Sequence, residues 1–361
     1  MGKSAVKGLF YICLIAATFV LATITIMAAF SGNVAPVDSV IMPLLGLAVP
    51  VLLIVNLITA LCWALARKRW ALVPLVAFFC NWGYLTSVFQ LPLPKDKTPA
   101  GKYLKIATYN IHNFGGEITG YSCKEIARYM QQEGVDVLCF QEFGDNSDFP
   151  TDSIRRVLSH WSHALIPSED SVKGVLPIAV FSRYPLANHR FITYQHSSNC
   201  SMMCDVVMGT DTIRLINNHL QTTSVSQKRR KWERELATDD TRREVQAAKD
   251  AAGTLHENFM KRATQTYVIS HYAKTSPYPV LLCGDFNSIP SSYTYHHLRK
   301  TLKDGFRTAG NGYMYTYRYA KRMLRIDYIF HSPSLKGIEY YSPDLDLCSD
   351  HNPVIMEVEI Q

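Results

Sequence analysis

Leu281-Leu282-Cys283-Gly284-Asp285-Phe286-Asn287 is the stretch around which the rest of the chain is organised. An apolar run typical of a buried strand breaks at Gly284, which permits close backbone approach, and then delivers Asp285 and Asn287. The i, i+2 spacing in extended chain points these two side chains the same way. Because a carboxylate beside an amide suits metal-assisted attack of water on phosphorus, the stretch predicts a strand that runs into an active-site loop.

Other segments repeat this arrangement of an apolar strand that carries polar residues. Strands are predicted at 104–110, 136–142, 177–182, 212–220, 325–330 and 354–360. Ser122-x-x-Glu125 predicts a capping box for a helix that runs to about Glu133 and stops at Gly134. A second and longer helix is predicted to begin at Thr241.

The polar motifs of these strands form an ordered set. They are TYNIH (108–112), DVLCFQE (136–142), NNHL (217–220), GDFN (284–287), RIDYIF (325–330) and SDHNP (349–353). This set resembles the endonuclease/exonuclease/phosphatase superfamily, in its deoxyribonuclease I-like branch, and the chain looks like a membrane-anchored, bacterial-type member. The resemblance covers about residue 103 to the C-terminus. It implies an α/β (α+β) four-layer sandwich, with two mixed β-sheets face to face and helices outside.

The resemblance also implies a metal site. Glu142 matches the residue that binds the catalytic divalent ion, Mg²⁺ or Mn²⁺, with help from Asn110. Asp350 matches an adjacent acidic contact to metal or phosphate. Chemistry agrees with this set, because a hard cation that retains several waters prefers carboxylates and an amide to Cys or His.

Five residues match catalytic positions of the family. Asp285 matches the residue that orients or deprotonates the attacking water, and Asn287 its neighbour that steadies the phosphoryl transition state. His351 matches the histidine that contacts the scissile phosphate, and Asp327 matches the carboxylate that fixes its tautomer. His219 matches a second histidine, a candidate general acid for the leaving oxygen.

Several residues near these motifs have two interpretations. Asn217 either holds its loop or contacts substrate phosphate, and His112 is interpreted as a surface or loop histidine. The alternating tyrosines at 313–319 predict a strand with one tyrosine face, expected to pack half-buried, with lining of the cleft as the alternative. The basic run 228–235 is expected to be a solvated helical face; an arm for anionic headgroups or nucleic acid is the alternative.

The N-terminal part predicts a membrane anchor. Uncharged apolar stretches at 8–30, 40–66 and 71–93 each exceed the roughly 20 residues that span a bilayer as helix. We therefore expect three transmembrane helices within residues 1–93, a linker at 94–102 and one domain at 103–361. Residues 1–102 hold eight Lys/Arg and two Asp/Glu, so they carry +6 of the formal +7, and the charge gives no indication of nucleic acid binding.

Loop charges predict the orientation of this anchor. Basic residues precede the first span and lie at 67–69, whereas the 31–39 connection has none, which predicts a periplasmic or outer face for everything after the third span. Lys95, Lys97, Lys102 and Lys105 favour the opposite orientation. The expected location is thus the inner membrane, with the bilayer as a partner.

Taken together, the sequence predicts a membrane-tethered, metal-dependent phosphoesterase. The substrate is left open among nucleic acid, phospholipid headgroups and inositol phosphates, and the oligomeric state is open too. The alternative is a non-catalytic membrane module that binds phosphorylated ligands. No cysteine spacing matches a zinc site, and a pair between Cys200 and Cys204 depends on the redox state of the compartment.

Overall fold

The computed structural model describes residues 3–91, 101–168, 174–223 and 241–360. The backbone divides into two compact units. The helical unit comprises Met1–Ser87 and Ile289–His297, and the sheet unit comprises Val88–Ser288 and Leu298–Gln361. The expected linker lies almost wholly outside the described residues, and the basic run 228–235 lies entirely outside them.

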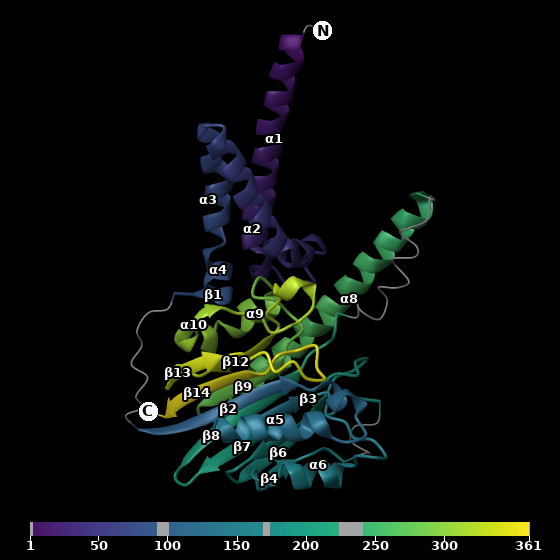
Figure 1. The fold of residues 1–361 in the computed structure, drawn as a ribbon, viewed down its shortest axis with the longest axis vertical. Coiled ribbons are helices and arrows are strands. Elements are labelled where there is room, and N and C mark those ends of the chain that lie inside the picture. The colour runs from purple at the N-terminus through teal and green to yellow at the C-terminus, as the bar shows by residue number, and fades with distance from the viewer. Residues whose placement is uncertain (1–2, 92–100, 169–173, 224–240, 361) are drawn as a thin grey trace. The chain divides into compact units, whose positions relative to one another are not determined.

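Two six-stranded mixed β-sheets pack face to face in the sheet unit (Figure 1). In spatial order, the first sheet holds β13 (Leu335–Tyr341), β14 (Val354–Ile360), β2 (Lys102–Asn110), β3 (Val137–Gln141), β5 (Ile178–Ser182) and β4 (His163–Leu165). The second holds β10 (Lys303–Asp304), β12 (Asp327–His331), β9 (Val280–Asp285), β8 (Asp211–His219), β7 (Cys200–Met208) and β6 (Leu186–Thr193). The predicted pair of mixed sheets is confirmed.

Helices form the outer layers of this sandwich (Figure 1). Apolar side chains of α5 (Tyr121–Gln132) and α6 (Thr151–Val157) bury one face of the first sheet. The long α8 (Thr241–Lys274) contacts β8 of the second sheet, and α10 (Gly305–Ala309) contacts β12 and β13. The core between the sheets is built from alternate residues of both, including the free and buried Cys200 and Cys204.

Two parallel strand pairs bring the polar motifs to one end of the sandwich. In the first sheet β2 runs parallel to β3, so that Asn110 is opposite Gln141 and next to Glu142. In the second sheet β8 runs parallel to β9, so that His219 is opposite Asp285. Because parallel strands end at the same edge, the residues that follow them gather there.

Gly284 is required by the contact between β8 and β9. Its φ is +132°, and a Cβ built there would lie 1.9 Å from the main-chain oxygen of Asn218. The backbone approach expected at this glycine is therefore confirmed.

Two local predictions were wrong. Helix α5 has no capping box: its N-cap is Gly120 in the left-handed region, and the Ser122 main-chain N–H and Oγ both donate to Glu117. The Glu117 carboxylate, just outside the helix, therefore accepts hydrogen bonds from the first turn. The tyrosine strand is only Gly312–Tyr313 (β11), which pairs with the two-residue strand β1 (Phe89–Gln90).

Within the described residues, the helical unit has two helices long and apolar enough to cross a membrane, namely α1 (Lys3–Ala29) and α2 (Ile41–Leu65). A third crossing is possible only if α3 (Leu72–Cys80) and α4 (Trp82–Val88) count as one span, because they are bent by 63°. The predicted third helix therefore ends five residues early, since Phe89 and Gln90 pair as a strand.

Buried polar side chains join these helices. Asn56 Nδ2 donates to Thr25 Oγ1 at 2.7 Å, and Asn81 Nδ2 donates to Thr25 O at 3.2 Å. The unit also includes the segment Ile289–His297, where Ser291 Oγ donates to Gly46 O at 2.8 Å. Such bonds satisfy polar groups among apolar helices.

Candidate functional site

Asp285 lies at the centre of the site, at the end of β9. Its side chain is 1% exposed, and its Oδ1 accepts a hydrogen bond from the Asn287 N–H at 2.8 Å. Its Oδ2 accepts from the side-chain amides of Asn110 and Asn287, both at 3.2 Å. Burial raises the pKa of Asp285 to about 7, against the opposing attraction of His351, so the group is suited to exchange a proton near neutral pH.

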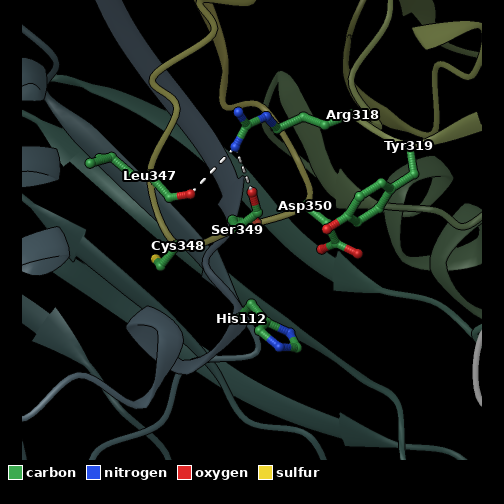
Figure 2. Close-up of a pocket in the computed structure, with 7 residues that line it drawn as sticks. All are labelled: His112, Arg318, Tyr319, Leu347, Cys348, Ser349 and Asp350. Carbon is green, nitrogen blue, oxygen red and sulfur yellow. Dashed lines mark hydrogen bonds between the residues drawn. The ribbon is translucent and has the colours of Figure 1, made fainter. Parts of the chain in front are cut away.

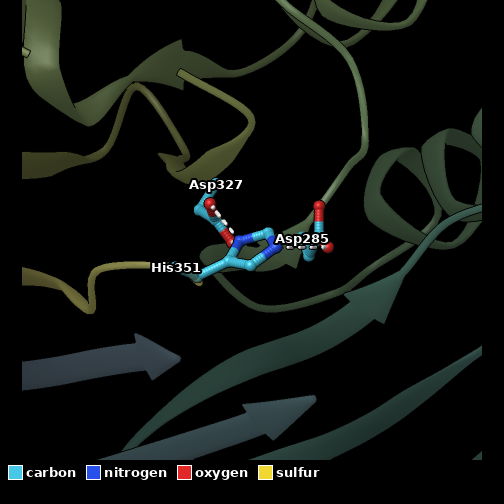
Figure 3. Close-up of side chains that lie close together, drawn as sticks. All are labelled: Asp285, Asp327 and His351. Carbon is cyan, nitrogen blue, oxygen red and sulfur yellow. Dashed lines mark hydrogen bonds and ion pairs between the residues drawn. The ribbon is translucent and has the colours of Figure 1, made fainter. Parts of the chain in front are cut away.

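His351 and Asp327 form a buried pair beside it (Figure 3). His351 Nδ1 lies 2.9 Å from Asp327 Oδ2, and His351 Nε2 faces Asp285 Oδ2 at 3.8 Å. Burial acts to lower the pKa of His351, but the charges of Asp327 and Asp285 outweigh it and raise the pKa to about 10. The imidazole is therefore protonated and oriented, as the sequence predicts for a phosphate contact.

Glu142 provides a second acidic group at the end of β3. Its Oε1 accepts from Asn110 Nδ2 at 3.2 Å, and its Oε2 lies 3.1 Å from His112 Nδ1. Burial favours the neutral form, but attraction to His219 and hydrogen bonds from Asn110 and His112 lower the pKa of Glu142. Asn110 thus links the Glu142 and Asp285 carboxylates of the two sheets.

His219 is fully buried between these two carboxylates. Its Nε2 lies 3.7 Å from both Glu142 Oε1 and Asp285 Oδ2. Neither ring nitrogen has a hydrogen-bond partner among the described residues. Burial lowers the pKa of His219 to about 4, which makes the ring neutral and leaves one N–H to donate to a bound group.

Asp350 lies on the wall of an open pocket of about 220 Å³ (Figure 2). His112 lines the same pocket, together with Arg318, Tyr319 and the segment 347–349. Arg318 donates to Leu347 O at 3.4 Å and to Ser349 O at 3.2 Å, which fixes the loop that carries Asp350. The pocket is therefore next to the acidic site, because His112 contacts Glu142 and Asp350 precedes His351 in the chain.

The side chains of Asn217 and Asn287 are fixed by hydrogen bonds to other residues of the protein. The Asn217 side chain is fully buried; it donates to Phe140 O and Ala179 O and accepts from Gln141, so it ties the two sheets together. This geometry favours the framework interpretation of Asn217 over a substrate contact. Asn287 has a φ of +48°, and its side-chain amide also donates to Leu220 O. Its position is therefore defined before any ligand binds.

One cluster among the described residues could hold a divalent ion. Asp285, Asp327 and His351 offer ligand atoms within 4.8 Å of one another. However, a protonated imidazole has no free lone pair and repels a cation, so this trio fits proton transfer better. Of the expected set, Asn110 and Glu142 are in contact at 3.2 Å, whereas Asp350 lies on the wall of the pocket that His112 also lines. The oxygen atoms of these side chains suit Mg²⁺ or Mn²⁺, and the pKa of Glu142 is lowered.

Three residues near the site were not assigned from the sequence. His112, interpreted as a surface histidine, contacts Glu142; its place in the TYNIH motif was the available signal. Tyr317 packs against the His351 ring, with 5.3 Å between centroids. Arg262 of α8 is 2% exposed and donates to Asn287 O and Thr223 Oγ1. Nothing in the helical periodicity distinguishes Arg262 from a surface arginine.

Family models match two parts of the chain. Residues 107–351, about two thirds of it, match the model described as the Endonuclease/Exonuclease/phosphatase family. Residues 9–88 match a model described as a domain of unknown function (DUF8431). No curated protein matches the chain.

Solved structures share the fold of the sheet unit. An endonuclease/exonuclease/phosphatase from Bacteroides vulgatus is 16% identical with a TM-score of 0.51, covering 72% of this chain and 100% of that one. One from Beutenbergia cavernae is 16% identical with a TM-score of 0.50, covering 72% of each chain. D. rerio TDP2, complexed with a single strand DNA product, is 14% identical with a TM-score of 0.50, covering 72% and 99%.

Proposed function

Because the chain belongs to the endonuclease/exonuclease/phosphatase family, we propose that it is a divalent-metal-dependent phosphoesterase tethered to a membrane. The observation that carries this proposal is the meeting of Asp285, His351 and Asp327 beside Glu142 and Asn110. The family fold supports hydrolase activity on phosphoesters, and its members generally depend on a divalent metal. No observation favours the non-catalytic alternative, since every acid, amide and histidine of the motif set is present.

We assign the water-directed role to Asp285. Its carboxylate is held at both oxygens, and a pKa of about 7 allows it to accept the proton of an attacking water. Protonated His351, fixed by Asp327, stabilises negative charge on the phosphoryl oxygens. Neutral His219 donates a hydrogen bond into the same space, which replaces the general-acid role expected of it.

Glu142, Asn110 and Asp350 would hold Mg²⁺ or Mn²⁺, which would supply Lewis acidity toward the phosphoryl group. His112 keeps one Glu142 oxygen in place and so acts as a positioning residue. The sequence order of these residues spans the whole sheet unit, so the metal set depends on the complete fold.

Membrane tethering rests on the apolar helices of the helical unit. We propose the inner membrane, with the sheet unit on the periplasmic face, on the basis of basic residues before α1 and at 67–69. Protease added to spheroplasts should then degrade the sheet unit while a cytosolic marker survives. Protection of the sheet unit would reverse the orientation.

The activity is tested with the full chain purified in detergent. Hydrolysis of bis-p-nitrophenyl phosphate should require Mg²⁺ or Mn²⁺ and stop with EDTA. Asp285→Asn and His351→Gln should each lower kcat at least 100-fold, because each removes a transition-state contact. Asp211→Asn and His160→Gln are matched controls at the surface of the same unit and should retain full activity. Activity of Asp285→Asn at the wild-type level would reject this site.

A further inference from the structure

One segment of the sheet unit connects the end of the last apolar helix with the catalytic histidine. This tyrosine segment comprises residues 312–322. Helix α4 ends at Val88, and the next two residues pair with the start of the segment, Phe89 opposite Tyr313 and Gln90 opposite Gly312. Met314 N also donates to Val88 O at 2.8 Å. The tyrosine segment is therefore fixed at the point where the chain leaves its apolar helices.

The other part of the tyrosine segment reaches the active site. Tyr317 forms a β-bridge with His351, and Arg318 N donates to Asp350 O at 2.8 Å. Four residues of extended chain, from Tyr313 to Tyr317, span at most about 14 Å. The backbone of His351 is thus a short distance from the place where the helix ends.

Large rings on this segment point outward. Tyr313 is 53% exposed, Tyr319 is 66% exposed and the paired Phe89 is 48% exposed. In contrast, the intervening Met314 is buried, so the alternation turns the aromatic side chains away from the core. Exposed aromatic rings at the end of an apolar helix are typical of a membrane–water interface, where ring bodies contact lipid and polar tips contact headgroups.

The charges of the segment favour lipid over nucleic acid. Single-stranded nucleic acid binds where aromatic rings line a strongly positive groove. Here Arg318 pairs with Asp344 at 3.4 Å and also with Asp346, and Arg322 pairs with Asp344 at 3.5 Å. These acids offset the charge of both arginines, and Lys321 is the remaining cation of the segment, so the described residues of the segment form no continuous track of positive charge. A bilayer surface does not require one.

We propose that the tyrosine segment lies in the headgroup layer of the bilayer and that the substrate is a phosphate ester carried by a lipid of that membrane. The headgroup layer is roughly 5–7 Å thick, so a phosphate within it is close to His351. In the reaction, water oxygen bonds to phosphorus, the bond from phosphorus to the leaving oxygen breaks, and that oxygen gains a proton. The substrate assignment rests on the proposed function, whereas the placement of the segment does not.

Placement is tested by hydroxyl-radical labelling of the full chain in nanodiscs of phosphatidylcholine and phosphatidylglycerol. Tyr121 and Tyr267, which are 57% and 68% exposed, are matched controls for Tyr313 and Tyr319. Tyr313 and Tyr319 should be modified at least fivefold more slowly than the controls, because lipid covers them. Equal labelling of all four tyrosines would overturn the placement.

The substrate is tested with Phe89→Ser/Tyr313→Ser, since neither residue lines the pocket, and the control Tyr121→Ser/Tyr267→Ser. The first pair should lower hydrolysis of lipids in vesicles of phosphatidylcholine, phosphatidylglycerol, phosphatidylinositol and phosphatidic acid at least tenfold. Both pairs should leave turnover of soluble bis-p-nitrophenyl phosphate within twofold of wild type.

The outcomes separate this inference from the proposed function. Wild-type turnover of the soluble diester with no lipid hydrolysis would overturn the lipid assignment alone. No turnover of either would mean that the proposed function itself is wrong. Hydrolysis of a single-stranded oligonucleotide, lost selectively in the Phe89→Ser/Tyr313→Ser variant, would assign the segment to nucleic acid instead.

Discussion

Substitution of Gly284 by alanine tests how the active site is built. A Cβ at this position would lie 1.9 Å from Asn218 O, and real Cβ contacts are essentially never closer than 3.0 Å, so β8 and β9 must separate by about 1.1 Å. The φ of +132° adds strain of about 1–3 kcal/mol for a residue with a side chain. Buried ladder bonds that such a shift breaks cost about 1–3 kcal/mol each.

The expected destabilisation is therefore about 4 kcal/mol, a large part of the roughly 5–15 kcal/mol that stabilises a typical protein. At about 2–4 °C per kcal/mol for a unit of this size, the Tm should fall by about 8–16 °C. Activity below that temperature should also fall, by roughly 100-fold, because β8 and β9 carry His219 and Asp285 and a 1 Å displacement misaligns them.

The assay is thermal unfolding of the full chain in detergent, with turnover of bis-p-nitrophenyl phosphate measured at 20 °C. The control is Gly253→Ala in α8, where glycine is exposed and no atom lies within 4 Å of the new Cβ. That change should raise stability by about 0.5–1 kcal/mol. A Gly284→Ala protein with the Tm and the kcat of wild type would refute the reasoning.

Three further predictions concern the chemistry. The kcat/KM should rise with pH through about 7 as Asp285 loses its proton, and fall near pH 10 as His351 loses its own. Asp327→Asn should move the alkaline limb to lower pH by at least one unit, since the charge that holds the His351 proton is removed; an unmoved limb would contradict the pairing. Arg262→Leu should lower kcat at least tenfold by freeing the Asn287 carbonyl, with partial recovery in Arg262→Lys; unchanged kcat in Arg262→Leu would exclude a positioning role.

Much of the architecture could be predicted because the patterns that indicate it lie within short continuous stretches of sequence. Apolar runs ending in Asn110, Glu142 and Asp285 predict the strands, and the family resemblance carried by the order of their motifs implies two mixed sheets face to face. The position of α5 was also predictable, although its first turn is satisfied by Glu117 rather than by a capping box. A cap supplied from outside the helix has no fixed spacing and leaves no local pattern.

The remaining parts of the site depend on contacts between distant residues. Arg262 reaches Asn287 from α8, and only this contact of the tertiary fold identifies it. The neutral state of His219 likewise follows from complete burial. The tyrosine segment has the alternating sequence of a strand, but only two of its residues pair with β1. Sequence periodicity does not indicate how many residues of a segment pair with a neighbouring strand.

Strand order in the first sheet determines when the candidate site can be completed during folding. Strand β14 is inserted between β13 and β2, although β2 is made about 250 residues earlier, and His351 lies three residues before β14. Such non-local pairing delays folding until the late strand is available. The first sheet, and with it the place of His351 beside Asp285, is therefore complete only when β14 has paired with β2.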